Sequence, residues 1–86
     1  MIMIKSKEMI VMLDASIVGK IIQEYRETKG ISQEVLSGLA GIGRTHLSAI
    51  ERGERRPTLD TFYKISQALD MRASGLLRAI EEELRE

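Results

Sequence analysis

Two short amphipathic segments flank a turn that is too short to hold any regular element. Residues 32–39 and residues 44–52 carry apolar side chains at helical spacing, and the four residues between them include two glycines. A turn of this length joins two helices at a steep angle. Only Leu47 and Ile50 are available for burial in the second segment, so its other face is polar. We therefore predict two crossed helices, the second of which projects from the fold.

The remaining apolar residues predict three more helices, and hence an all-α, compact five-helix bundle. Asp14 and Thr58 are typical N-cap residues, and Lys29 followed by Gly30 is a typical helix end. We expect helices over residues 15–29, 33–39, 44–52, 59–69 and 73–85. The side chains that we expect to face inward are Ile17, Ile21, Ile22, Tyr25, Val35, Leu36, Leu39, Leu47, Ile50, Leu59, Phe62, Ile65, Leu69 and Leu76.

The sequence contains no cysteine and a single histidine, His46. Disulfides and thiolate metal sites are therefore excluded, and a metal site built on one histidine is not expected. No nucleophile, base and orienting acid stand at a catalytic spacing, so we expect neither an enzyme nor a cofactor. The longest apolar run, residues 9–13, is far below the roughly 20 residues that span a bilayer. We expect a cytoplasmic protein with no membrane contact.

The formal net charge is zero, which by itself argues against binding to a polyanion. The charges are, however, unevenly distributed along the chain. Residues 20–56 carry seven Lys or Arg against five Asp or Glu, whereas residues 57–86 carry four against six. The segment that holds the two crossed helices therefore has a small positive excess, which indicates a weak preference for polyanions.

Five short motifs stand at fixed spacings within residues 17–84. They are Ser32-Gln33, Ala40-Gly41, Leu47-Ser48, Ile50-Glu51-Arg52-Gly53 and Pro57-Thr58-Leu59. Together they resemble the pattern of the lambda-repressor-like, or XRE-type, helix-turn-helix family. The resemblance implies a transcriptional regulator that binds double-stranded operator DNA with residues 44–52 in the major groove. Phage repressors, restriction-modification controller proteins and antitoxins all fit, and the short chain resembles the controller proteins best.

The polar face of residues 44–52 is suited to reading bases. Since Leu47 and Ile50 must face the core, the outward side chains are those of Arg44, Thr45, His46, Ser48 and Ala49. Arginine can donate two hydrogen bonds to guanine, and the methyl group of Thr or Ala can contact that of thymine. The resemblance assigns base contacts to Arg44, Thr45 and Ala49.

The resemblance also implies phosphate contacts and one ion pair. Gln33 begins a helix, where backbone N–H groups favour a phosphate. The other phosphate candidates are Arg26, Gly43, Arg52, Arg55 and Arg56, and for the last two the alternative is a charged surface turn. Arg26 and Glu51 are expected to form an ion pair that joins the first helix to the third.

Two positions depart from the family pattern. Gly43 stands where most members carry Ser or Thr, and Arg72 replaces the usual polar cap of the last helix. The loss of a capping side chain to glycine costs only a few tenths of a kcal/mol. Neither departure threatens the fold, but Gly43 lacks a hydroxyl group that would otherwise be able to bond a phosphate.

The two ends of the chain are expected to differ. Residues 1–13 show no clear period, and we interpret them as a partly ordered N-terminal arm or short extra element. Residues 14–86 are expected to form the helix-turn-helix domain and to end in a dimerisation helix. Four helices can close such a fold, so the apolar stripe of the fifth is either core or a contact with a second copy. To a two-fold homodimer we assign Met71, Leu77, Ile80 and Leu84.

A homodimer would place its two copies of the helix expected over residues 44–52 about 34 Å apart on a palindromic operator. The zero net charge keeps a second function open. In that alternative the chain is a protein-interaction module or antitoxin, which retains the fold but binds a protein partner.

Overall fold

The structure is a computed structural model that describes residues 12–85. Its five helices are α1 (Ala15–Thr28), α2 (Gln33–Ala40), α3 (Arg44–Glu51), α4 (Leu59–Ala68) and α5 (Ala73–Leu84). The described range contains no strand, and every expected helix ends within one residue of its predicted position. The all-α, five-helix prediction is confirmed. The expected arm over residues 1–13 lies outside the described residues, except for its last two.

Local capping explains where most of the helices begin. The Asp14 carboxylate accepts a 2.8 Å hydrogen bond from the backbone N–H of Ser16, and the Thr58 hydroxyl accepts one of 3.0 Å from Thr61. The Ser32 hydroxyl caps α2 in the same way. Each bond satisfies a donor that the first helical turn leaves without an intrahelical partner. Gly43 and Arg72 provide no side-chain cap for α3 and α5, as their residue types predict.

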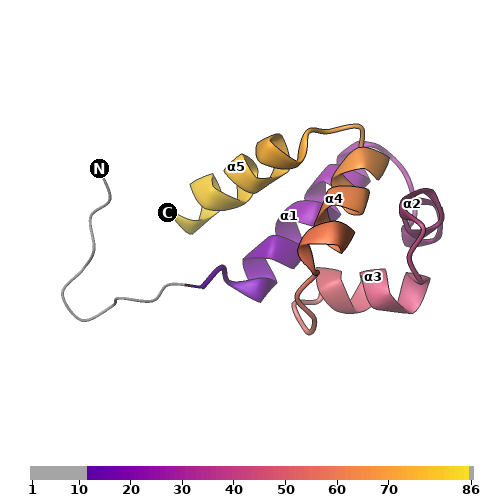
Figure 1. Cartoon of the computed structure of the whole chain (residues 1–86), viewed down its shortest axis with the longest axis horizontal. Coiled ribbons are helices and arrows are strands. Elements are labelled where there is room, and N and C mark those ends of the chain that lie inside the picture. Colours follow the sequence, from indigo (N-terminus) through magenta and orange to yellow (C-terminus); the bar gives the residue numbers. More distant parts are fainter. Residues whose placement is uncertain (1–11, 86) are drawn as a thin grey trace.

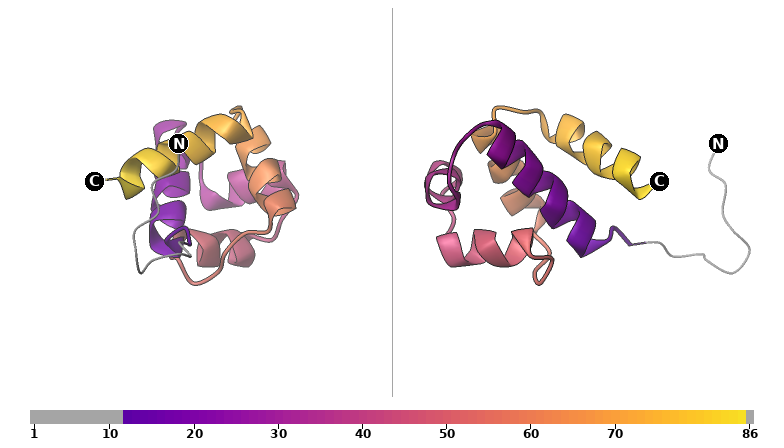
Figure 2. Two further views of the ribbon diagram at one scale, coloured as in Figure 1. Left: turned by 60° about the vertical axis from the view of Figure 1, so that its left-hand side comes forward. Right: turned by 180° about the vertical axis from the view of Figure 1, so that it is seen from behind.

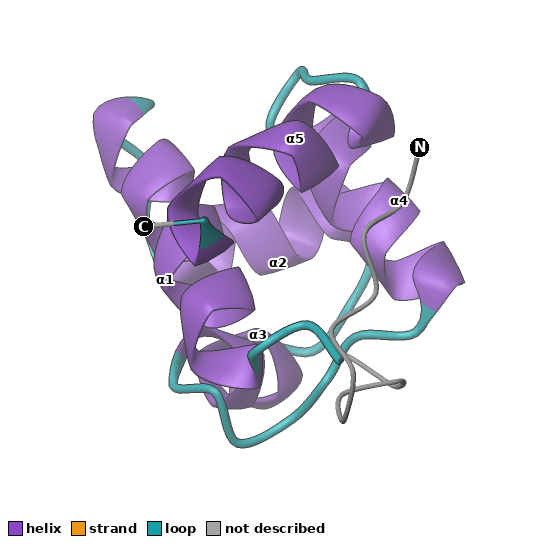
Figure 3. Cartoon of the chain, turned by 90° about the vertical axis from the view of Figure 1, so that its left-hand side faces the viewer, coloured by secondary structure: helices purple, strands orange, loops and turns teal. Residues whose placement is uncertain are grey.

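Helix α3 and the last helix α5 lie at opposite edges of the molecule, with α1 and α4 between them (Figure 1, Figure 2). Helix α1 packs against both α3 and α5, and α4 packs against α2 and α5. In Figure 1 α2 is viewed nearly along its axis, whereas α3 runs across the lower edge. Figure 3, a quarter-turn away, again shows α3 at the edge opposite α5. The steep crossing of α2 and α3 therefore leaves one side of α3 uncovered.

All five helices contribute to one apolar core. Its fully or almost fully buried members are Val18, Ile21, Ile22, Leu36, Ala40, Leu47, Ile50, Ile65, Leu69, Leu76 and Ile80. Burial of one such Leu or Ile side chain stabilises the fold by about 1.5 to 3 kcal/mol. The two core residues of α3, Leu47 and Ile50, are completely buried and determine which face of that helix points outward.

The prediction that Val35 and Leu39 face inward is wrong. These side chains are 47% and 64% exposed, while Leu36 and Ala40 are buried. Positions 36 and 40 share one face of α2, and positions 35 and 39 share the face about 100° away. A short helix that packs against α3 and α4 buries only one of these two faces.

Three further expectations need correction. Leu59, the first residue of α4, is 83% exposed, because it borders an open groove and not the closed core. Tyr25 is also partly exposed. Ile80, assigned to the dimer contact, is 0% exposed and belongs to the core together with Leu76, one turn before it. Of the four residues assigned to the dimer contact, only Leu77 is among the exposed large apolar side chains.

Candidate nucleic-acid interface

The N-terminal half of α3 is accessible within the crossed-helix unit, which consists of α2, α3 and the turn between them. Arg44 and Thr45 are exposed, and His46, Ser48 and Ala49 are half-buried around the same helix. Gly43 leaves the first turn without a side-chain cap, so its backbone N–H groups stay unbonded by any side chain. All five side chains expected to read bases therefore lie on one eight-residue helix, and two of them, Arg44 and Thr45, are exposed.

The C-terminal end of α3 lies against the backbone of α1 at Gly19. A Cβ atom at position 19 would be 2.2 Å from the carbonyl oxygen of Ile50 and 2.5 Å from that of Glu51. No larger residue fits without movement of one helix. The sequence analysis did not single out Gly19. The available signal was a glycine inside a helix, where it costs about 1 kcal/mol relative to alanine and so calls for a packing reason.

The chain leaves α3 through a second close contact, at Gly53. This residue has a φ of +78°, and a Cβ atom there would lie 2.8 Å from Cα of Ser16. A positive φ and a close backbone approach both favour glycine. Two glycines thus hold the C-terminal end of α3 against the first two turns of α1.

A buried ion pair joins the same two helices. The Arg26 guanidinium donates from Nε to Glu51 Oε2 at 2.8 Å and from Nη2 to Glu51 Oε1 at 3.0 Å. It also donates from Nη1 to the carbonyl oxygen of Ile31 at 2.9 Å. The hydrogen bonds with Glu51 raise the pKa of Arg26, although burial opposes the shift. The expected ion pair is present and, with the bond to Ile31, engages three of the five N–H donors of Arg26, which is 9% exposed. The phosphate contact expected of Arg26 stays a prediction.

Gln33 is half-buried at the start of α2 and takes part in this cluster. Its amide nitrogen Nε2 donates to Glu51 Oε1 at 2.9 Å. The sequence analysis placed Gln33 at the phosphate backbone and did not anticipate this contact. No local pattern signals a bond between residues 18 positions apart.

The arginines that follow α3 differ in how they are bonded. Arg52 forms a bidentate ion pair with Glu54, in which Nε and Nη2 each donate to a carboxylate oxygen at 3.0 Å. It also donates from Nη1 to the Ser48 hydroxyl. The pKa of the Glu54 carboxyl is lowered by the hydrogen bond and charge of Arg52. Arg55 is exposed and bonds no side chain within residues 12–85.

Arg56 donates to the carbonyl oxygen of Leu13, beside the start of α1. Of the three arginines, only Arg55 therefore has a guanidinium free of contacts within the described range.

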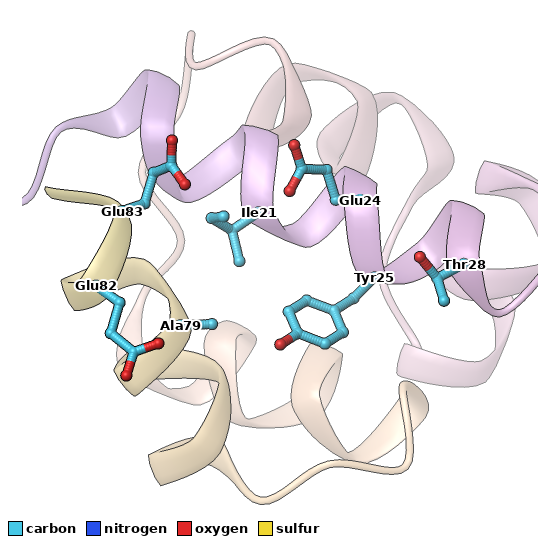
Figure 4. Close-up of a pocket in the computed structure, with 7 residues that line it drawn as sticks. All are labelled: Ile21, Glu24, Tyr25, Thr28, Ala79, Glu82 and Glu83. Carbon is cyan, nitrogen blue, oxygen red and sulfur yellow. The ribbon is translucent and has the colours of Figure 1, made fainter. Parts of the chain in front are cut away.

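A group of three acidic side chains lies between α1 and α5. Glu24, Glu82 and Glu83 line a hollow of about 290 Å³ between α1 and α5, around Ile21 and Ala79 (Figure 4). Glu83 forms an ion pair of 3.0 Å with Lys20. Because α5 lies at the edge opposite α3, the negative charge of Glu82 and Glu83 is spatially separated from the accessible end of α3. A net charge of zero therefore conceals an uneven distribution of charge in space.

An apolar groove of about 390 Å³ lies between the start of α1, the start of α4 and α5. Its lining residues are Met12, Leu13, Ala15, Val18, Arg56, Pro57, Thr58, Leu59, Phe62 and Leu77. Leu77 was expected to be available for a dimer contact. Of the two lining residues that were expected to be core, Leu59 is exposed, whereas Phe62 is half-buried and packs against the core. Met71 and Leu84, which were also assigned to the dimer, pack partly against the core and do not line the groove.

Two kinds of site are not found within residues 12–85. No group of three or more His, Asp or Glu side chains is arranged to hold a metal ion. None of the helices in this range combines the length and apolar character required for a membrane crossing.

Comparison with known proteins identifies the family. A family model described as helix-turn-helix matches residues 22–76, more than half of the chain. The HTH-type transcriptional regulator y4dJ of Sinorhizobium fredii is 35% identical over 66 residues, which cover 77% of this chain and 86% of the relative. Control protein C.SmaI of Serratia marcescens is 34% identical over 61 residues, or 71% and 73% of the two chains.

Solved structures show the same fold. The restriction-modification controller protein C.AhdI of Aeromonas hydrophila has a TM-score of 0.72 and 36% identity, covering 73% of this chain and 96% of its own. Controller protein C.Esp1396I, solved as a tetramer with its 35 base-pair operator, has a TM-score of 0.80 and 26% identity, covering 88% and 100%. These relatives are transcriptional regulators or controller proteins, in agreement with the sequence prediction of a regulator and not an enzyme. The chain belongs to the XRE-type helix-turn-helix family of transcriptional regulators.

Proposed function

We propose that this protein binds a specific palindromic DNA operator as a homodimer and thereby regulates transcription. The observation that carries the proposal is the uncovered N-terminal half of α3, where Arg44 and Thr45 are exposed. A helix presented in this way fits a major groove about 12 Å wide. The controller protein C.Esp1396I, which is similar in fold, has been solved on its operator, and this supports the proposal.

Base recognition is assigned to the accessible face of α3. Arg44, Thr45 and Ala49 are the main readers, and His46 and Ser48 flank them. Arg44 is suited to two hydrogen bonds with guanine, while Thr45 and Ala49 offer methyl groups to thymine. Ser48 already accepts a hydrogen bond from Arg52, so its hydroxyl is oriented before DNA arrives.

Phosphate contacts are assigned to both ends of the crossed-helix unit. At the start of α2 these are the backbone N–H groups and the amide of Gln33, and at the start of α3 the backbone around Gly43. Arg55 is the cation best placed to add charge attraction, because no other described side chain bonds it. Arg52 and Arg56 contribute less in this proposal, since Glu54 and the Leu13 carbonyl already occupy their guanidinium groups.

The second copy is proposed to cover the apolar groove that Leu59, Phe62 and Leu77 line. Leu59 is 83% exposed and Leu77 is 37% exposed, so their burial would gain free energy from removal of apolar area from water. The groove includes Leu77 of α5, one of the four residues that the sequence analysis assigned to the dimer contact. A two-fold dimer through this face presents two copies of α3 to successive turns of one DNA face.

The DNA-binding proposal is tested by a gel-shift titration of the full chain with genomic duplex fragments at increasing salt. We expect selective retention of some fragments, with an affinity that falls linearly on a logarithmic plot against salt concentration. Retention of no fragment at low salt would contradict the proposal and favour a protein-interaction module.

The dimer proposal is tested by sedimentation of the Leu59→Glu and Leu77→Glu variants. We expect the unmodified chain to sediment as a dimer and both variants as monomers, because a buried carboxylate in the interface is unfavourable. The matched control is Leu39→Glu, which changes another exposed leucine that lies outside the groove. Loss of the dimer in the control, or its persistence in both groove variants, would rule out this interface.

A further inference from the structure

The contact between Gln33 and Glu51 links the two helices of the crossed unit at the point where α2 would meet a phosphate. Glu51 Oε1 accepts both from Gln33 Nε2 at 2.9 Å and from Arg26 Nη2 at 3.0 Å. A carboxylate can only accept hydrogen bonds, so the amide must turn its nitrogen and not its oxygen towards Glu51. The orientation of the Gln33 side chain is therefore determined by its partner.

Arg26 strengthens this arrangement from the other side of the α2 N-cap. It donates to the carbonyl oxygen of Ile31, the residue before the cap Ser32, while Glu51 holds Gln33, the residue after it. Glu51 itself is only 6% exposed, and every buried side-chain polar atom in the described range has a hydrogen-bond partner. The first turn of α2 is thus fixed on both sides of its cap to the C-terminal end of α3.

We propose that Glu51, supported by Arg26, is a positioning residue that orients the Gln33 amide for a DNA phosphate. The amide nitrogen has two hydrogens, and the second has no acceptor within residues 12–85. Because the amide group is planar, the bond to Glu51 also sets the direction of this second N–H. In the free protein the Gln33 side chain then already adopts the rotamer that contacts the phosphate, which reduces the conformational entropy lost on DNA binding.

This arrangement also relates phosphate contact to base reading. Glu51 is the last residue of α3, the helix whose first residues are assigned to bases. A phosphate held at Gln33 therefore fixes the register of α3 along the groove, as backbone contacts do in protein–DNA complexes. The inference rests on the proposed DNA binding and names the residue that positions one of its contacts.

The first test is a double-mutant cycle in DNA affinity. Gln33→Met is made in the unmodified chain and in the Arg26→Met/Glu51→Met background, where the ion pair is replaced by apolar side chains of similar volume. Such replacement of a whole buried pair is often neutral for folding. The probe is a labelled duplex that the unmodified chain selects from a random library, and thermal unfolding checks that each variant is folded.

We expect Gln33→Met to weaken binding about tenfold in the unmodified chain and less than about threefold in the background without the pair. The loss should be equal for preferred and unrelated duplexes, and the salt dependence should stay unchanged because no cation is removed. The matched control is Gln67→Met, an exposed glutamine of α4. An equal loss in both backgrounds would show that Glu51 does not position Gln33.

A second measurement needs neither DNA nor a variant. The side-chain amide of Gln33 should show an NMR order parameter above about 0.8, and that of exposed Gln67 a value below about 0.6. Equal mobility of the two amides would overturn the inference even if the protein binds DNA. Failure to bind any duplex, combined with a rigid Gln33 amide, would instead refute the proposed function and leave the orientation by Glu51 intact.

Discussion

The two ends of α3 differ in nearly every physical respect. At the C-terminal end Glu51 is buried in an ion pair, Ile50 is 0% exposed, and backbone atoms lie against Gly19. At the N-terminal end Arg44 is exposed and Gly43 provides no side-chain cap. One end thus carries the contacts that hold the helix, and the other is left for a ligand. Substitutions at the two ends should therefore separate stability from DNA affinity.

The largest effect is expected from Gly19→Ala. Its methyl group would lie 2.2 Å from the Ile50 carbonyl oxygen, so α1 and α3 must separate. We expect a loss of roughly 4 kcal/mol or more in the free energy of unfolding, measured in urea. The matched control is Gly75→Ala in α5, where no atom lies within 4 Å of the added methyl group. That variant should gain about 0.5 to 1 kcal/mol, and equal effects of the two changes would contradict the close approach of α1 and α3.

The next largest effect is expected when the buried ion pair is broken from one side. Arg26→Met leaves the Glu51 carboxylate buried without its cation. We expect a loss of about 3 to 5 kcal/mol in the free energy of unfolding, most of which the Arg26→Met/Glu51→Met variant should recover. If the single and double variants were equally stable, the pair would not be desolvated as the structure shows.

At the accessible end, Arg44→Ala should affect binding and not folding. We expect a loss of about 1 to 3 kcal/mol in affinity for the selected duplex and a relaxed preference at one base pair. The free energy of unfolding should change by less than about 0.5 kcal/mol, because the side chain is exposed. The control is Lys64→Ala, which removes one positive charge from an exposed side chain of α4. An unchanged base preference in Arg44→Ala would refute its assignment as a base reader.

The smallest effect is expected from Gly43→Ser. Gly43 has a φ of −72°, and no atom lies within 4 Å of a Cβ at this position, so a serine fits without strain. Its hydroxyl can cap α3 and should add a few tenths of a kcal/mol of stability. For a domain of this size that corresponds to a rise of about 2 °C in Tm. A fall in Tm would show that residue 43 does not adopt the N-cap conformation that allows a serine hydroxyl to bond the first turn of α3.

The helix positions were accessible from sequence because their signals are local. Asp14, Ser32 and Thr58 each bond a backbone N–H two or three residues away, so the pattern and its physical cause lie within one turn. The direction in which a helix faces was less accessible. Both faces of α2 that contain apolar pairs fit the helical period, and only packing against α3 and α4 buried Leu36 and left Leu39 exposed.

The site was predicted unevenly for the same reason. The exposure of Arg44 and Thr45 followed from the burial of Leu47 and Ile50 on the same short helix. The pair of Arg26 with Glu51 came from resemblance to a family, since 25 residues separate them. The bond from Gln33 to Glu51 and the approach of Gly19 to Ile50 were missed, because no periodic pattern encodes a contact between separate helices.

The amino-acid sequence alone determined five helices, their limits and the polar face of the third, because caps, turns and apolar spacing act over a few residues. Tertiary structure alone decided that Ile80 is core, that Leu59 borders an open groove, and that Gln33 and Arg26 share one carboxylate. Those outcomes depend on which surfaces meet when the helices pack. Close packing of the whole domain determines which surfaces meet, because the buried volume holds only some of the apolar side chains.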